Sequence, residues 1–196
     1  MFSDVFGLTK AVLEGRKTMT RRAVLKSVIT EAYKKVSEAT RDKDVDDETL
    51  DRMTDEFVLA RSPFRVGEIV AVAQNLKDMG YDARDTKTIN GAIWGLDHTP
   101  AWTNKMFVCA SMCVHHIRIT DVRIERIQEI SDEDCLKEGI IEGDAEPKLY
   151  GFKNGKHYDS FFSPREAFAA LIDIISGKDT WESNPYVFVY EFELVK

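Results

Sequence analysis

The 196-residue sequence has few of the features that mark secreted or membrane-bound proteins. It contains three cysteines, Cys109, Cys113 and Cys135, an odd number that gives no disulfide framework and is typical of a reducing compartment. No apolar run approaches the roughly 18 residues of a membrane-spanning helix. The first residues also lack the basic-then-apolar pattern of a secretion signal. We therefore expect a cytoplasmic protein without a membrane partner.

A basic surplus is absent as well, because 27 Lys and Arg stand against 34 Asp and Glu, for a net charge of −7. Proteins that coat nucleic acid without sequence preference rely on many Lys and Arg contacts to phosphate, so this composition argues against that class. Any site for a polyanion must therefore be local. The length and the hydrophobic content of 43% are those of a globular protein with an ordinary core.

The densest group of chemically useful side chains is the octet Gly15-Arg16-Lys17-Thr18-Met19-Thr20-Arg21-Arg22. Between Lys10 and Lys26, six basic residues stand against one acidic residue. Cations just past a helix C-terminus are favoured by the helix dipole, which accounts for Arg16 and Lys17 without any ligand. The helix dipole does not account for Arg21 and Arg22, which lie further along the chain. A local site for an anion or phosphate is therefore as good an explanation of the octet as helix capping.

Hydrophobic periodicity and capping residues predict helices over residues 3–14, 24–39, 47–59, 131–138 and 163–177. In the first helix Asp4 is the expected N-cap, and the last two are expected to be capped by Ser131 and Ser163. Strands are predicted over 66–73, within 106–127 and over 186–194. The middle region is long enough for two strands or one bent strand, with a bulge or a turn near Thr120-Asp121.

The elements indicate one α+β domain spanning residues 1–196. Strands interleave with short helices without a regular βαβ period, which is typical of a small mixed sheet or barrel with peripheral helices. We interpret residues 24–60 as a helical insertion, residues 77–100 as a long loop with at most one short element, and residues 141–160 as a loop.

A metal site is the weaker explanation of the cysteines and histidines. Cys109, Cys113 and His115 would share one face of a regular strand, and His116 or Cys135 would complete a zinc site. The paired C-x-x-C spacing of such sites is missing, so small buried thiols on an apolar strand are favoured. We expect neither a metal nor a cofactor.

Three residues suggest proton chemistry. Glu138 in the last turn of a helix meets the negative end of the helix dipole, which suits a proton-handling group or an ion pair with a lysine, although a plain surface residue remains the alternative. A threonine hydroxyl needs a base, and Lys17 serves as one if burial or nearby cations lower its pKa. Lys17 and Thr20 would then follow the logic of Ser–Lys hydrolases.

The octet fits the G-x-K-x-x-x-x-R motif of the ASCH (activating signal cointegrator homology) domains. Further segments resemble phage-type members of this family: Val66-Gly67-Glu68, Ile119–Ile127, Glu138-Gly139-Ile140, Ala167–Leu171 and Trp181–Val187. Two features depart from the family pattern. Gln74 stands where an acidic residue usually ends the first long strand, and the helical insertion is not part of the minimal domain.

The resemblance implies a PUA-like β-barrel and two alternative functions. In the first, an RNA- or nucleoside-binding domain uses Arg16, Lys17, Arg21 and Arg22, next to Gly15, to grip phosphate, and Trp102 offers a stacking face. In the second, the chain resembles a bacterial branch of the family that hydrolyses the amide of N4-acetylcytidine with a Lys, a Thr and a Glu. These match Lys17 as the base, Thr20 as the nucleophile and Glu138 as the carboxylate that orients or neutralises the lysine, with Arg21 or Arg22 and backbone N–H groups stabilising the oxyanion. Activation of water by Lys17 and Glu138 is the other route.

Overall fold

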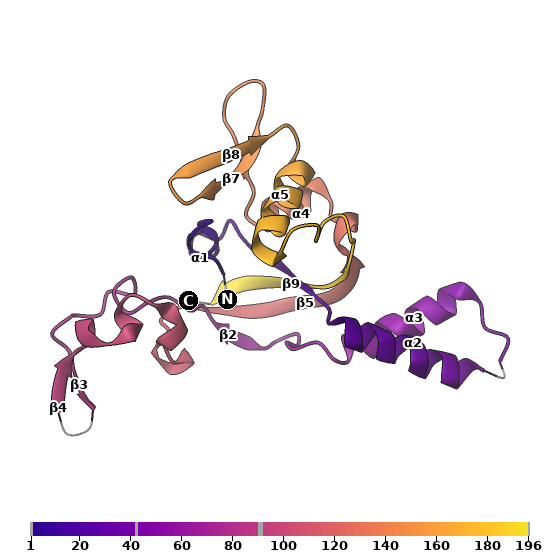
Figure 1. Cartoon of the computed structure of the whole chain (residues 1–196), viewed down its shortest axis with the longest axis horizontal. Coiled ribbons are helices and arrows are strands. Elements are labelled where there is room, and N and C mark those ends of the chain that lie inside the picture. The colour runs from indigo at the N-terminus through magenta and orange to yellow at the C-terminus, as the bar shows by residue number, and fades with distance from the viewer. Residues whose placement is uncertain (1, 42, 90–91, 196) are drawn as a thin grey trace.

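The structure is a computed structural model that describes residues 2–41, 43–89 and 92–195. Its centre is a curled antiparallel sheet, half of a barrel, whose strands run in the order β1-β9-β5-β2 (Figure 1). The bounds of these strands are β1 (Met19–Ala23), β2 (Ile69–Ala71), β5 (His116–Arg126) and β9 (Tyr186–Val195). The two long central strands are rich in β-branched and aromatic residues, which pack well on a pleated surface.

The curl of the sheet has a local cause in β5. The register between β5 and β9 shifts between Ile119 and Asp121, where one extra residue is inserted. Such a bulge bends its strand and increases the twist. This confirms the bulge predicted near Thr120-Asp121.

Five helices surround the sheet in the described part of the chain. Their bounds are α1 (Leu8–Leu13), α2 (Lys26–Thr40), α3 (Asp47–Leu59), α4 (Asp132–Lys137) and α5 (Pro164–Ser176). The predicted N-caps Ser131 and Ser163 are confirmed, since each side chain accepts a hydrogen bond from the backbone N–H three residues on. The first helix is shorter than predicted because Asp4 pairs with Lys105 at 2.8 Å, and Gly7 takes the N-cap position instead.

Two loop predictions are wrong. Residues 141–160 contain a second antiparallel sheet of β6 (Ile141–Glu142), β7 (Tyr150–Asn154) and β8 (His157–Phe161). Residues 77–100 contain the hairpin of β3 (Thr86–Ile89) and β4 (Ala92–Gly95) as well as short 3-10 turns; residues 90 and 91 lie outside the described part. In both segments each strand is paired with a strand close to it along the chain, and among the side chains that the structure describes there only Phe152 of β7 belongs to the buried core.

Two strand predictions extend too far. β2 covers only three residues, and Ile69 is 47% exposed, because β2 forms an edge of the sheet. Ahead of β5, residues 105–115 form the 3-10 turns η3 (Lys105–Phe107) and η4 (Ala110–Met112) rather than a strand. The remaining 3-10 turns are η1 (Leu96–His98), η2 (Pro100–Trp102) and η5 (Ile127–Glu129).

The core consists of two clusters, one on each face of the sheet. Along β9, Val187 and Val189 belong to the cluster under α4, α5 and the second sheet, whereas Phe188 and Tyr190 belong to the other. This division follows from the alternation of side chains along a strand. Ala32 of α2 and Val58 of α3 join the second cluster, so the base of the helical pair packs on the sheet.

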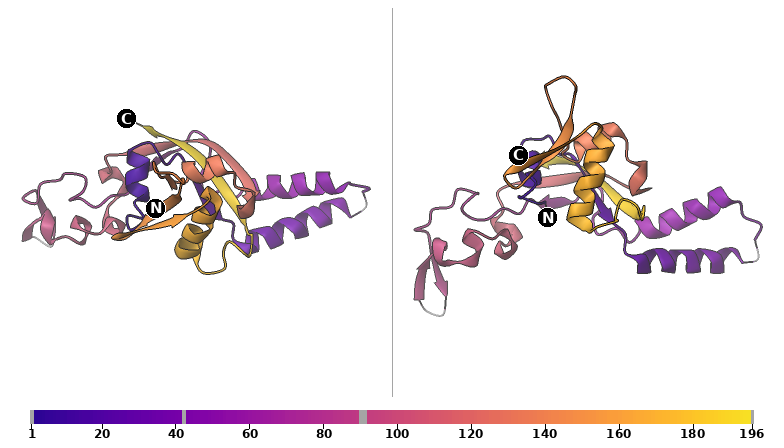
Figure 2. Two further views of the ribbon diagram at one scale, coloured as in Figure 1. Left: turned by 90° about the horizontal axis from the view of Figure 1, so that it is seen from above. Right: turned by 45° about the horizontal axis from the view of Figure 1, so that its top comes forward.

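The molecule is elongated by extensions at its two ends. The pair α2–α3 projects from one end and the β3–β4 hairpin from the other (Figures 1 and 2). In the described ranges, no helix has both the length and the apolar character needed to cross a membrane.

Candidate functional site

The site is built on β1, an edge strand of the sheet. Its even positions bond to β9, since the Phe192 N–H donates to the Thr18 carbonyl and the Val24 N–H donates to the Tyr186 carbonyl. In an antiparallel ladder the odd residues then turn their backbone groups the other way. The carbonyl of Met19 and the N–H groups of Arg21 and Ala23 therefore face the open edge of the sheet.

Lys17 lies just before β1 and is buried, with 2% of its side chain exposed. Its amine donates to the Met19 carbonyl at 2.8 Å, to the Glu138 carbonyl at 2.7 Å and to Glu138 Oε2 at 2.6 Å. An ammonium has three N–H donors, so the set is fully used. The ring of Phe2 lies on the same amine, with its centroid 5.8 Å from Nζ.

Glu138 is delivered to this position by the short helix α4. Ser131 fixes the start of α4, and Glu138 is its C-cap. The chain then turns at Gly139, whose φ of 106° is strained for any other residue. A Cβ at Gly139 would also approach Leu8 to 3.1 Å, so the turn is closely packed. The Ser131 cap and the turn at Gly139 together fix the position of the Glu138 carboxylate.

Burial lowers the pKa of the Lys17 ammonium from its ordinary value, while the Glu138 carboxylate acts in the opposite direction. The lowering prevails because the amine is fully removed from solvent. Lys17 therefore loses a proton more easily than an exposed lysine, and a base of this kind is suited to proton transfer.

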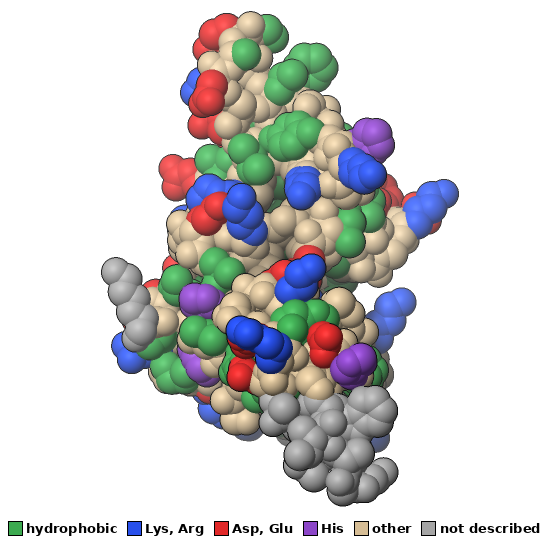
Figure 3. Space-filling view, turned by 90° about the vertical axis from the view of Figure 1, so that its left-hand side faces the viewer, with side chains coloured by type: hydrophobic (Ala, Val, Ile, Leu, Met, Phe, Trp, Pro, Cys, Tyr) green, Lys and Arg blue, Asp and Glu red, His purple; other side chains and the backbone are tan. Residues whose placement is uncertain are grey.

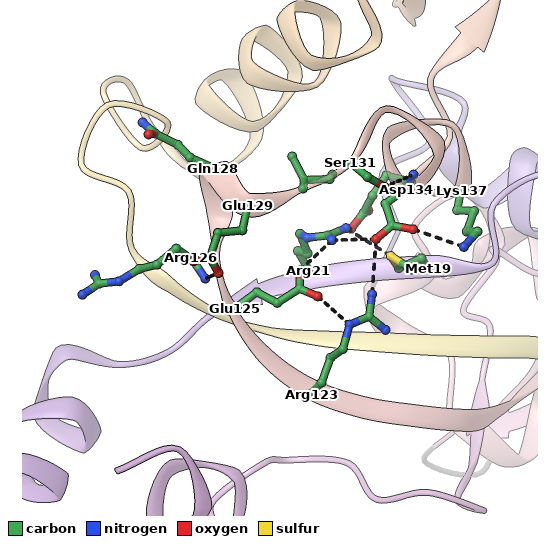
Figure 4. A network of polar contacts seen from close by, with 12 residues as sticks. Met19, Arg21, Arg123, Glu125, Arg126, Gln128, Glu129, Ser131, Asp134 and Lys137 are labelled. Atoms are coloured by element: carbon green, nitrogen blue, oxygen red, sulfur yellow. Dashed lines mark hydrogen bonds and ion pairs between the residues drawn. The ribbon is translucent and has the colours of Figure 1, made fainter. Parts of the chain in front are cut away.

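Arg21 is engaged by carboxylates rather than open to a ligand (Figure 4). Its guanidinium donates to Glu125 at 2.9 Å, to Asp134 at 3.1 Å and to Glu138 Oε1 at 3.4 Å. Only 1% of the side chain is exposed. Arg123 adjoins it, bonded to Asp134 at 3.2 Å and to Glu191 at 2.6 Å. Arg21 thus holds the second oxygen of Glu138 and compensates its charge.

The three candidate catalytic residues line one cavity of about 240 Å³. Lys17, Thr20 and Glu138 contribute with Arg21 and Arg22, and the remaining wall is largely apolar. That apolar wall includes residues of α5 and its surroundings, namely Phe168, Leu171, Ile172 and Ile175, together with Phe2 and Leu8.

Thr20 reaches this cavity from the other face of the strand. Met19 packs in the cluster beneath α5, so Thr20 and Arg22, one position out of phase, point to the opposite side. Within the described ranges, no hydrogen bond joins the Thr20 hydroxyl to Lys17 or Glu138. The residues share a cavity because it extends around the open edge of β1.

The residues predicted to grip nucleic acid are not gathered in the same way. Gly15 provides the exit from α1 with a φ of 73°, and Arg16 pairs with Glu14 at 2.7 Å and lines a different cavity. Trp102 lies in η2, and it does not line the cavity of Lys17. Lys17, Arg21 and Arg22 of that set do line it, but Lys17 and Arg21 are paired with carboxylates.

Sequence reasoning missed Phe2 and Asp134. Phe2 carries no motif, and its role depends on contacts with both core clusters. The side chain of Asp134 bonds Arg21, Arg123 and Lys137. The available signal was the set Asp121, Arg123 and Glu125, whose charges alternate in sign along one side of a strand.

The cysteines do not form the predicted common face. Cys109 is exposed, whereas Cys113 and Cys135 are buried, because the segment before β5 forms 3-10 turns. Burial raises the pKa of Cys135 to about 12. Across the residues that the structure describes, no three His, Cys, Asp or Glu side chains gather closely enough to hold a metal ion.

Comparison with known proteins gives no relative on which to rest a function, since no family model, curated protein or solved structure matches the chain.

Proposed function

We propose that this protein is an ASCH-type, PUA-like domain that hydrolyses the N4-acyl amide of a cytosine nucleoside such as N4-acetylcytidine. The curled half-barrel sheet and the motif octet on its edge strand support the family assignment. The observation that carries the activity is the buried Lys17–Glu138 pair, 2.6 Å apart, in the wall of a cavity that Thr20 also lines.

The reaction needs a group that moves a proton in both directions. Water adds across the amide C–N bond, giving a carboxylic acid and the free N4 amine. The neutral Lys17 amine takes the proton of the attacking O–H group, and its ammonium then gives a proton to the departing N4. The lowered pKa of Lys17 favours the first step, and the acceptors around Nζ stabilise the ammonium between the two steps.

Two attacking oxygens fit this cavity. In one route the Thr20 hydroxyl attacks, an acyl-threonine forms, and water then releases it. In the other route water attacks directly and Thr20 orients the amide. The N–H of Arg21 at the open edge and the Arg22 side chain in the cavity wall supply donors for the developing oxyanion.

The test is the release of cytidine from N4-acetylcytidine, followed by chromatography. Lys17→Ala is expected to lower kcat at least about 100-fold, a typical contribution of general-base catalysis. Lys10→Ala is the matched control, since Lys10 is 77% exposed and lies on α1 away from the cavity. Each variant is checked for folding by circular dichroism. Absence of cytidine with the wild type, or full turnover by folded Lys17→Ala, contradicts the proposal.

A valine at Thr20 separates the two routes. Thr20→Val keeps the shape but removes the hydroxyl, so it abolishes turnover if Thr20 is the nucleophile. It leaves most of kcat if water attacks directly. Mass spectrometry of quenched wild-type reactions gives an independent reading, because only the first route places an acyl group on the peptide that contains Thr20.

Binding of RNA without hydrolysis is the second candidate, supported by Arg22 in the cavity wall. Against it stand the net charge of −7 and the intermixed basic and acidic side chains on the face seen in Figure 3. This candidate predicts affinity for RNA oligonucleotides that falls steeply with salt and weakens in Arg22→Ala. Such binding by a protein that releases no cytidine replaces the hydrolase with this candidate.

A further inference from the structure

A second, smaller cavity of about 60 Å³ adjoins the site on the other face of β1. Three residues line both cavities: Phe2, Thr20 and Arg22. Phe2 packs against both core clusters, and its ring centroid lies 5.6 Å from that of Phe192. Phe2 therefore forms part of the partition between the cavities, and Thr20 stands at their junction.

The smaller cavity has an apolar lining apart from the shared Thr20 and Arg22 and from Tyr190. The Tyr190 hydroxyl is already hydrogen-bonded to Ser62 at 2.9 Å. The Phe64 ring packs edge to face on Tyr190 with centroids 5.5 Å apart. The other lining residues are aliphatic: Val70, Ala71, Ala73, Ile117 and Ile119. An apolar group gains from entering such a space, whereas a polar one loses its hydration.

We propose that this smaller cavity is the acyl pocket of the hydrolase, an inference that rests on the function proposed above. The larger cavity takes the cytosine nucleoside, and the scissile carbonyl lies beside Thr20 at the junction. With about 60 Å³ against about 240 Å³, the smaller cavity offers a quarter of the space of the larger cavity. The pocket therefore takes a short unbranched acyl group such as acetyl and rejects an aromatic acyl group.

Val70 is the residue through which the pocket is best altered. It lies on the edge strand β2, is half-buried and packs against the second core cluster. Val70→Ala lengthens the pocket and Val70→Phe fills it. Val122→Ala is the matched control, because Val122 is also half-buried against the same cluster but does not line the pocket.

The experiment measures kcat/KM for the acetyl, propionyl, butyryl and benzoyl amides of cytidine with the four proteins. The wild type is expected to favour acetyl over benzoyl by more than tenfold. Val70→Ala is expected to raise the ratio of butyryl to acetyl about tenfold, the effect of one or two methylenes in an apolar pocket. Val122→Ala leaves that ratio unchanged, and Val70→Phe lowers kcat/KM for acetyl.

The outcomes separate the pocket from the activity. Hydrolysis of every amide at similar kcat/KM, or equal ratios in Val70→Ala and Val122→Ala, overturns the acyl pocket while the hydrolase stands. Failure of the wild type to hydrolyse any of the amides overturns both. If Val70→Phe does not fold, the comparison of the two alanine variants decides.

Discussion

At the scale of single residues, the pairing of Lys17 with Glu138 is the most consequential contact in the molecule. Both side chains are almost fully buried, and the pair has the help of two backbone carbonyls and of Arg21. Removing two charges from water is costly, and only good geometry offsets it. The same burial lowers the pKa of Lys17, so one environment accounts for both the structural and the proposed chemical roles.

We predict that Lys17→Met destabilises the protein by about 3–5 kcal/mol, because it leaves the buried Glu138 carboxylate with only its longer contact to Arg21, at 3.4 Å, as charge compensation. Urea unfolding at neutral pH measures the change. The control is Arg52→Ala, which removes a pair with Glu56 on the exposed face of α3 and is expected to cost less than about 1 kcal/mol.

A second variant separates pairing from packing. Lys17→Met combined with Glu138→Gln also removes the buried negative charge that has lost its nearest cation, so the double variant is expected to be more stable than Lys17→Met alone. Equal costs for Lys17→Met and Arg52→Ala would show that the buried pair does not have this energetic weight.

At the scale of secondary-structure elements, α4 sets the position of the candidate site. It has only six residues, too few to be stable alone, so its end is defined by its caps and its packing. Ser131 lies at one end of it and Glu138 at the other. A change at Ser131 is therefore expected to displace the carboxylate of Glu138.

We predict that Ser131→Ala lowers both stability and turnover. Loss of an N-cap costs about 1 kcal/mol, and fraying of α4 loosens Glu138. Ser163→Ala is the matched control: it removes the equivalent cap of α5, whose 13 residues line the cavity only from Phe168 onward, more than one turn from that cap. It is expected to cost the same stability and to leave turnover of N4-acetylcytidine unchanged. Equal losses of turnover in the two variants would contradict the positioning role of α4.

At the scale of the whole molecule, one group of ion pairs connects three strands of the sheet to α4. Asp134 of α4 bonds Arg21 of β1 and Arg123 of β5, and Arg123 bonds Glu191 of β9. Burial on its own would raise the pKa of Asp134, but the hydrogen bonds from Lys137 and Arg21 outweigh it, and the pKa lies below its usual value. Asp134 therefore stays ionised in the folded protein at pH values where the unfolded chain is already protonated.

The sign of the pH dependence follows from this shift. Where the unfolded chain binds more protons, stability rises with pH. The contribution of Asp134 is thus fully present above the usual aspartate pKa of about 4, and it is lost as pH falls through the lower folded value.

We predict that the free energy of unfolding of the wild type decreases as the pH is lowered from about 5 to about 3. The decrease is expected to be less steep in Asp134→Asn. Urea unfolding at a series of pH values measures both slopes. Asp44→Asn is the control, because Asp44 is an exposed aspartate on the α2–α3 connection, outside this group of charges, and its removal is expected to leave the slope close to that of the wild type. A slope for Asp134→Asn equal to that of the wild type would remove Asp134 from the acid response.

How far prediction from sequence succeeds depends on how local each feature is. The helices at 47–59 and 163–177 were predicted closely, because an apolar stripe and a capping residue act within a few turns. The hairpin of β7 and β8 was missed although Asn154-Gly155 is a common tight-turn pair. Its strands lie against each other and against α5, and their sequence does not show that pairing.

By itself, the sequence determined the capped helices, the bulged central strand and the concentration of Lys17, Thr20, Arg21 and Arg22 in one octet. Only the tertiary structure decided how these four residues are arranged around the cavity and which partners hold them. Alternation along β1 separates Thr20 from Met19 and Arg21, and the partner of Lys17 comes from 121 residues away. Burial and pairing depend on such distant contacts. Because of them, Lys17 is held by Glu138, Arg21 is paired with several carboxylates, and Thr20 and Arg22 lie where the two cavities meet.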